Sequence, residues 1–248
     1  MSRSLPLARL CGIRVRIHWS WLPLYGLVTW SVATTVLPYS RGLSFAVAAI
    51  YAILLFGSLV LHELAHALVA RTFGVRTRSI TLFLFGGVAT LECEPPTPRA
   101  EVLVAAAGPV ASAVLAGFCA LGAVVLGPLS AVAAGRVAGD LLILLAWGNA
   151  AIAVFNLIPA FPMDGGRILH ALLWRVRKSR AHATAIASLC GLGLGMVFAI
   201  GSLITLAATR EWQFGWYLVL SSFLIRTTWQ GYTDARAITR IERLRPAA

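Results

Sequence analysis

Charged residues are scarce in this sequence, and acidic residues are the scarcest of them. Of 248 residues, 21 are Lys or Arg and 9 are Asp or Glu, so that charged residues make up only 12%, against roughly 25% in an average soluble domain. Hydrophobic residues make up 59%, and the mean hydropathy is +0.82. A soluble domain of this length could not cover its surface with so few charges. The composition therefore excludes an ordinary soluble protein and predicts an integral membrane protein.

The number and the spacing of the cysteines predict no cysteine-based structure. The four cysteines are scattered singly along the chain and form no Cys-x-x-Cys pair: Cys11, Cys93, Cys119 and Cys190. Neither a disulfide framework nor a thiolate zinc site is encoded by such spacing.

Six stretches are long and apolar enough to cross a bilayer, whose core of roughly 30 Å needs about 20 residues of helix. Several tryptophans lie near the ends of these stretches, as expected of an aromatic belt. The sequence thus predicts an all-α polytopic membrane protein with six spans, at residues 19–37, 43–70, 102–126, 141–161, 184–208 and 212–229.

The positive charges are distributed very unevenly between the connections. Eighteen of the 21 lie on one side of the six predicted spans, and only Arg41, Arg136 and Arg210 lie on the other. Because Lys and Arg concentrate in cytoplasmic loops, both termini are predicted to be cytoplasmic. The net charge of +12 then reports membrane topology, and no nucleic-acid partner is expected.

The connection between the second and third spans has the composition of a β-hairpin. Residues 79–92 are rich in β-formers around Gly86 and Gly87, which are predicted to form the turn. Strands this apolar are expected to be buried against the membrane domain, because lipid cannot satisfy an unpaired backbone. The fold prediction therefore includes a short membrane-associated hairpin.

The second span contains His62-Glu63-Leu64-Ala65-His66, although ionisable groups inside a span are costly and suggest function. Residues i and i+4 lie on one face of a helix, so that both imidazoles can bind one metal ion. Zinc accepts imidazole nitrogen and keeps one position open for water in catalytic sites. Glu63 is placed to accept a proton from that water. This is the HExxH pattern of metalloproteases.

Two histidines need a third ligand, and Asp164 is predicted to supply it. Among the nine acidic residues, only Asp164 lies at the cytoplasmic end of an apolar span, at the depth predicted for His62 and His66. His170 and His182 are rivals, but they lie among arginines and are predicted to be solvated.

The segment before Asp164 is unusual for the end of a transmembrane helix. Pro159 and Pro162 each remove a helical donor, so that the helix is predicted to break within the membrane. A break at this depth is tolerated where it lines an enclosed cavity. Gly165 and Gly166 are predicted to form a tight turn after the acid. Asn156 supplies an amide that could bind a peptide backbone or stabilise an oxyanion.

These motifs resemble those of the site-2 protease family of intramembrane zinc metalloproteases. His62 through His66 resembles its first motif, and the Asn-x-x-Pro-x-x-Pro-x-Asp-Gly run at 156–165 resembles its second. Residues 85–88 resemble its hairpin and residues 107–109 the entry to its third core helix. Residues 12–19 are similar to the N-terminal stretch of its six-span microbial branch.

The resemblance implies one Zn²⁺ per chain, held by His62, His66 and Asp164, with Glu63 as the general base. It also implies that a peptide bond is cleaved in or near the transmembrane segment of a membrane-anchored protein, such as an anti-sigma factor or a membrane-tethered regulator. Asn156, Gly86 and Gly87 are the expected substrate-binding residues. A bacterial plasma membrane is the expected location.

The sequence departs from the family at several points. It contains neither a CBS pair nor a PDZ insertion, so that residues 1–248 are predicted to form a single protease domain. Many relatives continue into a cytoplasmic regulatory domain, and the resemblance implies either that this protein lacks one or that these 248 residues are part of a longer chain. Ser112 stands where the family often has Asn.

Two other functions use the same polar residues. A metal- or proton-coupled transporter could use the His, Glu and Asp cluster as an ion path, although neither inverted repeats nor several mid-span charges are visible. Another class of membrane metalloprotease would need a glutamate as the third ligand. Glu92, Glu94 and Glu101 fit that role poorly by position.

Overall fold

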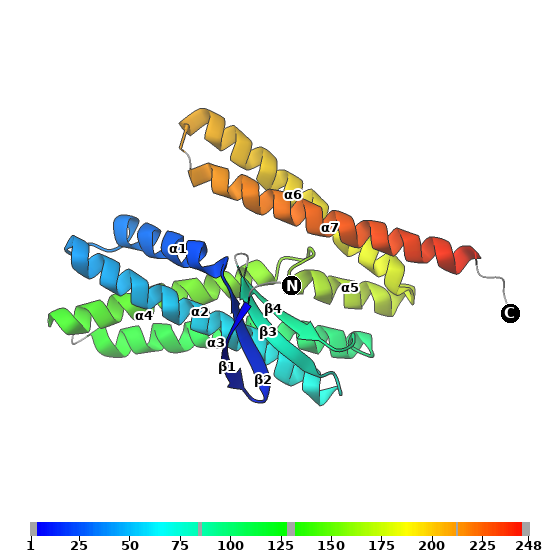
Figure 1. Ribbon diagram of the computed structural model, residues 1–248, viewed down its shortest axis with the longest axis horizontal. Helices are drawn as coiled ribbons and strands as arrows, with labels where there is room; N and C mark the ends of the chain where they lie inside the picture. The colour runs from blue at the N-terminus through cyan, green and yellow to red at the C-terminus, as the bar shows by residue number, and fades with distance from the viewer. Residues whose placement is uncertain (1–3, 84–85, 128–131, 212, 245–248) are drawn as a thin grey trace. The chain divides into compact units, whose positions relative to one another are not determined.

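The computed structural model describes residues 4–83, 86–127, 132–211 and 213–244 (Figure 1). Its elements follow the order β1 (Ser4–Leu10), β2 (Ile13–His18), α1 (Trp21–Thr35), α2 (Arg41–Thr72), β3 (Thr77–Phe83), β4 (Gly86–Leu91), α3 (Pro98–Leu126), α4 (Ala133–Asn156), α5 (Asp164–Arg177), α6 (Arg180–Thr209) and α7 (Gln213–Leu244). The chain forms two compact units. The first comprises Met1–Pro95 and Ala107–Val154, and the second comprises Pro96–Ala106 and Phe155–Ala248.

Four helices among the described residues are long and apolar enough to cross a membrane: α2, α3, α4 and α6. They correspond to the predicted second to fifth spans, which identifies the chain as a membrane protein. The helix α1 has 15 residues, fewer than the roughly 20 that a span needs. The helix α7 has 32 residues but lies outside this set, because polar side chains, including Arg226, interrupt its apolar half. Six spans therefore stay a prediction.

The predicted hairpin is confirmed, but its turn is displaced. Strands β3 and β4 pair antiparallel, with Gly86 opposite Phe83 and Gly87 opposite Leu82. The two glycines are therefore paired strand residues of β4. The prediction that they form the turn is wrong. Residues 84 and 85, which lie between the strands in the sequence, are outside the described part of the chain.

A second hairpin, formed by β1 and β2, was not predicted from the sequence. Cys11 and Gly12 connect its strands with φ angles of 51° and 85°, a left-handed pair of the kind that two-residue hairpin turns require. Strand β2 then pairs parallel with β3. The result is a four-stranded sheet in the order β1-β2-β3-β4 (Figure 1).

The sheet packs on one face of α2. Leu64 and Ala67 of α2 form a buried cluster with Ile13 of β2 and Ile80 of β3. A second cluster joins Val60 of α2 to the same two strands. Because Val60, Leu64 and Ala67 recur every three or four residues, they form one stripe along the helix. The sheet thus covers one side of α2 and leaves another side for different contacts.

In the second unit, the helix α4 ends at Asn156 and α5 begins at Asp164, so that the predicted break at Pro159 and Pro162 is confirmed. The predicted turn at Gly165 and Gly166 is wrong, because both residues belong to α5. Glycine is required at positions 165 and 166 because of close backbone contacts and not because of a turn. A Cβ atom on Gly165 would lie 2.2 Å from the Leu157 carbonyl oxygen, and one on Gly166 would meet the Ala160 backbone at 2.4 Å. The preceding loop therefore packs directly on the first turn of α5.

The helices α6 and α7 pack along much of their length in the second unit (Figure 1). Small residues allow this close approach. A Cβ atom on Gly195 would lie 2.9 Å from the Ile225 side chain, and one on Gly231 would lie 3.1 Å from the Ser188 hydroxyl. Close packing at small residues is typical of helix pairs in membranes.

Candidate metal centre

The two histidines of the HExxH motif lie on the side of α2 that the sheet does not cover, and Glu63 lies at the border of the covered side. A helix advances by about 100° per residue, which places His62 and His66 roughly opposite the stripe that contacts the sheet. The same arithmetic places Glu63 between the two histidines and that stripe. Both histidines are buried, with exposed fractions of 2% and 6%. The helix thus directs the imidazoles to one partner and the carboxylate towards the edge of the sheet.

The two imidazoles converge through their Nε2 atoms. These atoms lie 3.2 Å apart, and the rings meet at an angle of 80°. Zn–N distances of about 2.0–2.1 Å in tetrahedral geometry separate two nitrogen ligands by about 3.3 Å. The pair therefore has the spacing of two ligands of one zinc ion, and His62 and His66 could hold such an ion.

Gly108 of α3 provides the room beside these nitrogen atoms. A Cβ atom built on Gly108 would lie 2.2 Å from Nε2 of His66 and 2.5 Å from Nε2 of His62. Any side chain at position 108 would therefore occupy the space into which both imidazoles point. The two histidines can therefore hold zinc both because their nitrogens are correctly spaced and because Gly108 leaves room for the ion.

One turn after Gly108, Ser112 lies behind His62. Its Oγ is 2.9 Å from Nδ1 of His62, and the residue is fully buried. Ser112 stands where the family often has Asn, and it still makes a polar contact at this position. The short side chain of serine reaches the imidazole directly.

Glu63 packs against the strand that carries the two predicted glycines. A Cβ atom on Gly87 would lie 2.6 Å from Cγ of Glu63 and 3.1 Å from its Oε1. Strand β4 lies at one edge of the four-strand order. The carboxylate of Glu63 is therefore held between the imidazoles and the edge of the sheet.

Two further predicted site residues, Asp164 and Asn156, belong to the second unit. Asp164 is the first residue of α5 and is 9% exposed. Asn156 is the last residue of α4 and is partly exposed. The roles assigned to all of the candidate site residues stay predictions: His62, Glu63, His66, Asp164, Asn156, Gly86 and Gly87.

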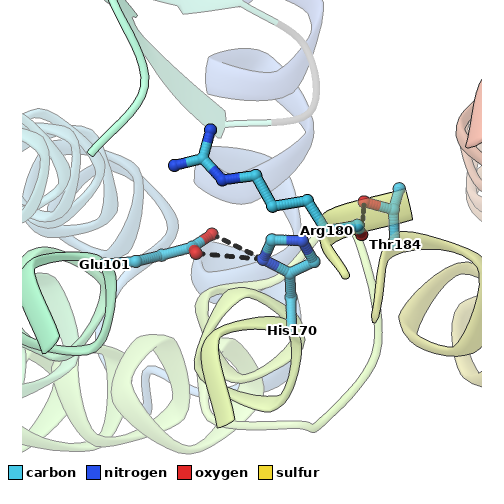
Figure 2. Close-up of polar contacts among 4 residues, drawn as sticks. All are labelled: Glu101, His170, Arg180 and Thr184. Carbon is cyan, nitrogen blue, oxygen red and sulfur yellow. Dashed lines mark hydrogen bonds and ion pairs between the residues drawn. The ribbon is translucent and has the colours of Figure 1, made fainter. Parts of the chain in front are cut away.

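His170 differs from its predicted state. It is 7% exposed, and Nδ1–H donates to both carboxylate oxygens of Glu101, at 2.9 and 3.0 Å. Figure 2 shows the two side chains pointing toward each other, Glu101 from the start of α3 and His170 from α5. The prediction that His170 is solvated is wrong, because a carboxylate 69 positions away replaces water. His182, by contrast, is exposed.

Aromatic rings enclose this pair within the second unit. The ring of Phe161 lies 5.9 Å from that of His170, and the ring of Trp174 lies 6.4 Å away. The guanidinium of Arg180 lies over the Trp174 ring, 4.0 Å from the ring centroid, in the range of cation–π contact. The pair is thus part of a packed structural cluster.

Two other acidic residues are engaged elsewhere, which removes them as rivals of Asp164. Asp140 accepts a hydrogen bond from the Tyr39 hydroxyl. Burial and this carboxylate together raise the pKa of Tyr39 to about 12. Glu92 pairs with Arg78 at 3.4 Å on the surface. Glu101 is bound by His170, so that two of the three glutamates considered as a third ligand, Glu92 and Glu101, are engaged elsewhere.

Sequence reasoning missed Gly108 and Ser112 as parts of the site. The signal was present, because Ala107-Gly108-Pro109 had been noted as a motif and Ser112 follows Gly108 by one helical turn. Residues at i and i+4 share a face, so that both can meet one partner helix. That α2 is this partner could not be read from the local sequence.

Buried paired imidazoles with an adjacent carboxylate, carried by a helix apolar enough to cross a membrane, match the arrangement of the HExxH motif. Comparison with known proteins agrees. The model of peptidase family M50 matches residues 50–136 and 123–200. The chain belongs to peptidase family M50.

Individual relatives give the same result. A protein of Synechocystis sp., named as a proposed zinc metalloprotease, is 37% identical over 98% of this chain and 63% of its own length. Rip3 of Mycobacterium tuberculosis, also named as a proposed zinc metalloprotease, is 39% identical over 82% of this chain and 54% of its own. The chain thus spans little more than half to two thirds of these relatives.

A solved structure supports the fold directly. The site-2 protease from Methanocaldococcus jannaschii is similar with a TM-score of 0.61 and 29% identity, over 92% of this chain and 95% of that one. The resemblance to site-2 proteases noted in the sequence is therefore confirmed.

Proposed function

We propose that this protein is an intramembrane zinc endopeptidase that hydrolyses a peptide bond in or near the transmembrane segment of membrane-anchored proteins. The convergence of the His62 and His66 imidazoles beside Gly108 carries this proposal. Membership of a peptidase family favours it over the metal- or proton-coupled transporter. The names of the relatives, which specify zinc metalloproteases, support the choice of metal.

Asp164 is proposed as the third zinc ligand. Two imidazoles leave a tetrahedral ion without enough protein ligands, and a carboxylate oxygen is a common third donor. Asp164 is nearly buried although it is acidic, and Gly165 and Gly166 let the preceding loop pack on its helix. Its position in a motif of the family supports the same role.

When bound, zinc would supply a Lewis acid that lowers the pKa of water towards about 7 and polarises a carbonyl group. The protein's own residues would do the rest. Oε1 or Oε2 of Glu63 would accept the proton of the attacking water and then deliver it to the leaving amide nitrogen. A glutamine at position 63 could still form hydrogen bonds but could not accept this proton, and an alanine could do neither.

Substrate is proposed to bind by strand addition to β4. This strand lies at an edge of the sheet, and its Gly87 contacts Glu63, so that an added strand would run past the general base. Backbone pairing would hold the peptide extended, whereas a helix hides its carbonyl groups. Gly86 belongs to the same edge, and the amide of Asn156 is proposed to bind the substrate backbone or stabilise the oxyanion.

The proposed membrane arrangement has six spans with both termini in the cytoplasm of a bacterial cell. The distribution of Lys and Arg supports it, because 18 of 21 lie on one side of the predicted spans. Reporter fusions at residues 38–40 and at the C-terminus would test it. The six-span arrangement predicts an outer location for the first and a cytoplasmic location for the second.

The decisive experiment compares Glu63→Gln with the wild type, using co-expressed single-span membrane proteins tagged at both ends. Glu63→Gln is expected to retain zinc and to lower cleavage by at least about 100-fold, the contribution of a general base. Trapped, uncleaved partners of this variant would identify the substrates. Undiminished cleavage by Glu63→Gln would reject the mechanism.

Asp164→Ala separates the ligand from the base. The account expects this variant to lose zinc as well as cleavage, whereas Glu63→Gln loses cleavage alone. Asp234→Ala, on the C-terminal part of α7, is the matched control and is expected to change neither. A full complement of zinc in Asp164→Ala would remove Asp164 from the ligand set.

A further inference from the structure

The contact between Ser112 and His62 extends the metal centre beyond its ligands. The Ser112 Oγ lies 2.9 Å from Nδ1 of His62, and no part of Ser112 is exposed. The two residues come from different helices, α3 and α2, and are separated by 50 positions. A hydroxyl buried this completely beside an imidazole can accept a hydrogen bond from it.

The direction of that hydrogen bond follows from the other ring nitrogen. Nε2 of His62 is the atom that converges with Nε2 of His66, at 3.2 Å. A ligand nitrogen must present its lone pair to the metal, so that the single proton of a neutral imidazole resides on Nδ1. Nδ1–H of His62 then donates to the Ser112 Oγ, and the hydroxyl proton stays available for another acceptor.

We propose that Ser112 is a positioning residue for the metal centre, which fixes the tautomer and the ring rotation of His62 so that Nε2 faces the metal. The inference rests on the proposed zinc site. A partner on the second nitrogen of a ligating histidine both orients the ring and increases its basicity. Ser112 would therefore raise the affinity for zinc without touching the ion.

The position of Ser112 on α3 supports this role over simple packing. Gly108 precedes it by one turn, and the space beside Gly108 is where both Nε2 atoms point. One face of α3 thus provides the room for the metal at position 108 and the acceptor for the imidazole at position 112. Two other buried serines differ, because the hydroxyls of Ser202 and Ser221 donate to carbonyl groups of their own helices.

The test measures zinc affinity by competition with a chelator, on the full chain purified in detergent. Ser112→Ala is expected to bind zinc about 10- to 100-fold more weakly, the usual effect of removing such a partner. Ser221→Ala is the matched control. Ser221 is also buried, at 1% exposed, and its hydroxyl donates to the Tyr217 carbonyl of the same helix, α7. This control is expected to bind zinc as the wild type does.

Two further measurements separate positioning from packing. The visible spectrum of the Co²⁺-substituted protein reports ligand geometry and is expected to change in Ser112→Ala and not in Ser221→Ala. The melting temperature of the zinc-free protein is expected to be the same for the two variants. Equal zinc affinity in Ser112→Ala and wild type, or an equal loss in both serine variants, would overturn the inference.

The wild type distinguishes failure of this inference from failure of the proposed function. If the wild type and His62→Ala bind zinc equally, the zinc site itself is wrong. If the wild type binds zinc, His62→Ala does not, and Ser112→Ala matches the wild type, only the role of Ser112 is rejected.

Discussion

The protein contains two buried histidine sites that use similar residues in different ways. In α2, the ε nitrogens of His62 and His66 approach each other to 3.2 Å beside the bare Cα of Gly108. In the second unit, Nδ1–H of His170 donates to both oxygens of Glu101 (Figure 2). In the first site two imidazole nitrogens point into a space where a metal ion could bind. In the second site the imidazole nitrogen is already hydrogen-bonded to a carboxylate.

This difference separates a metal centre from a structural pair. Burial alone does not, because His170 is nearly as buried as His66, at 7% against 6% exposed. Charge alone does not either, since a glutamate lies close to each site. What matters is whether the imidazole nitrogens converge on room for a ligand or terminate on a carboxylate that already satisfies them.

The largest effect should come from filling the space in the first site. Gly108→Ala places a methyl group where both Nε2 atoms point, so that neither imidazole can bind the metal in its present position. We expect zinc affinity to fall by more than about 100-fold, beyond the loss of one supporting hydrogen bond. Gly117→Ala on the same helix, where a Cβ meets nothing within 4 Å, is the control. Zinc bound equally by both variants would contradict the account.

Breaking the second site should affect stability and leave the metal in place. His170→Ala buries the Glu101 carboxylate without its partner, which should lower the free energy of unfolding by about 3 kcal/mol. Denaturant titration in micelles would measure this change. Adding Glu101→Leu to His170→Ala should recover part of the loss, because no charge is then left unpaired.

If His170→Ala retains its stability but loses zinc, then His170 belongs to the metal centre and the distinction between the two sites fails.

A smaller effect is expected from the strand beside the general base. Gly87→Ala adds a methyl group 2.6 Å from Cγ of Glu63, which must shift the carboxylate. We expect kcat to fall by about 10-fold, as a displaced catalytic group does, with zinc content unchanged. Gly57→Ala on α2, in open space, should leave kcat as it is. Unchanged kcat in Gly87→Ala would show that the β4 contact does not position Glu63.

The sequence predicted the parts of this structure that depend on local patterns. The HExxH spacing placed two imidazoles on one helical face, and the β-formers around residues 79–92 predicted the β3–β4 hairpin. The alternation of Ile13, Val15 and Ile17 with arginines was a further signal, for strand β2, that was not used. Its parallel pairing with β3, more than 60 positions away, has no local signature.

The errors share a physical cause. His170 was expected in water because its neighbours in sequence are arginines, yet its partner Glu101 lies 69 positions away. Gly86 and Gly87 were expected in a turn, yet they are strand residues, and Gly87 is small because Glu63 of α2 packs on it. In each case a contact between distant segments decided the role of a residue whose local propensity suggested another.

The most direct test of the central claim is the zinc content per chain of three purified proteins, the wild type, His62→Ala and His170→Ala. The account predicts one zinc ion in the wild type and in His170→Ala, and none in His62→Ala. Zinc retained by His62→Ala, or lost equally from the two histidine variants, would contradict it.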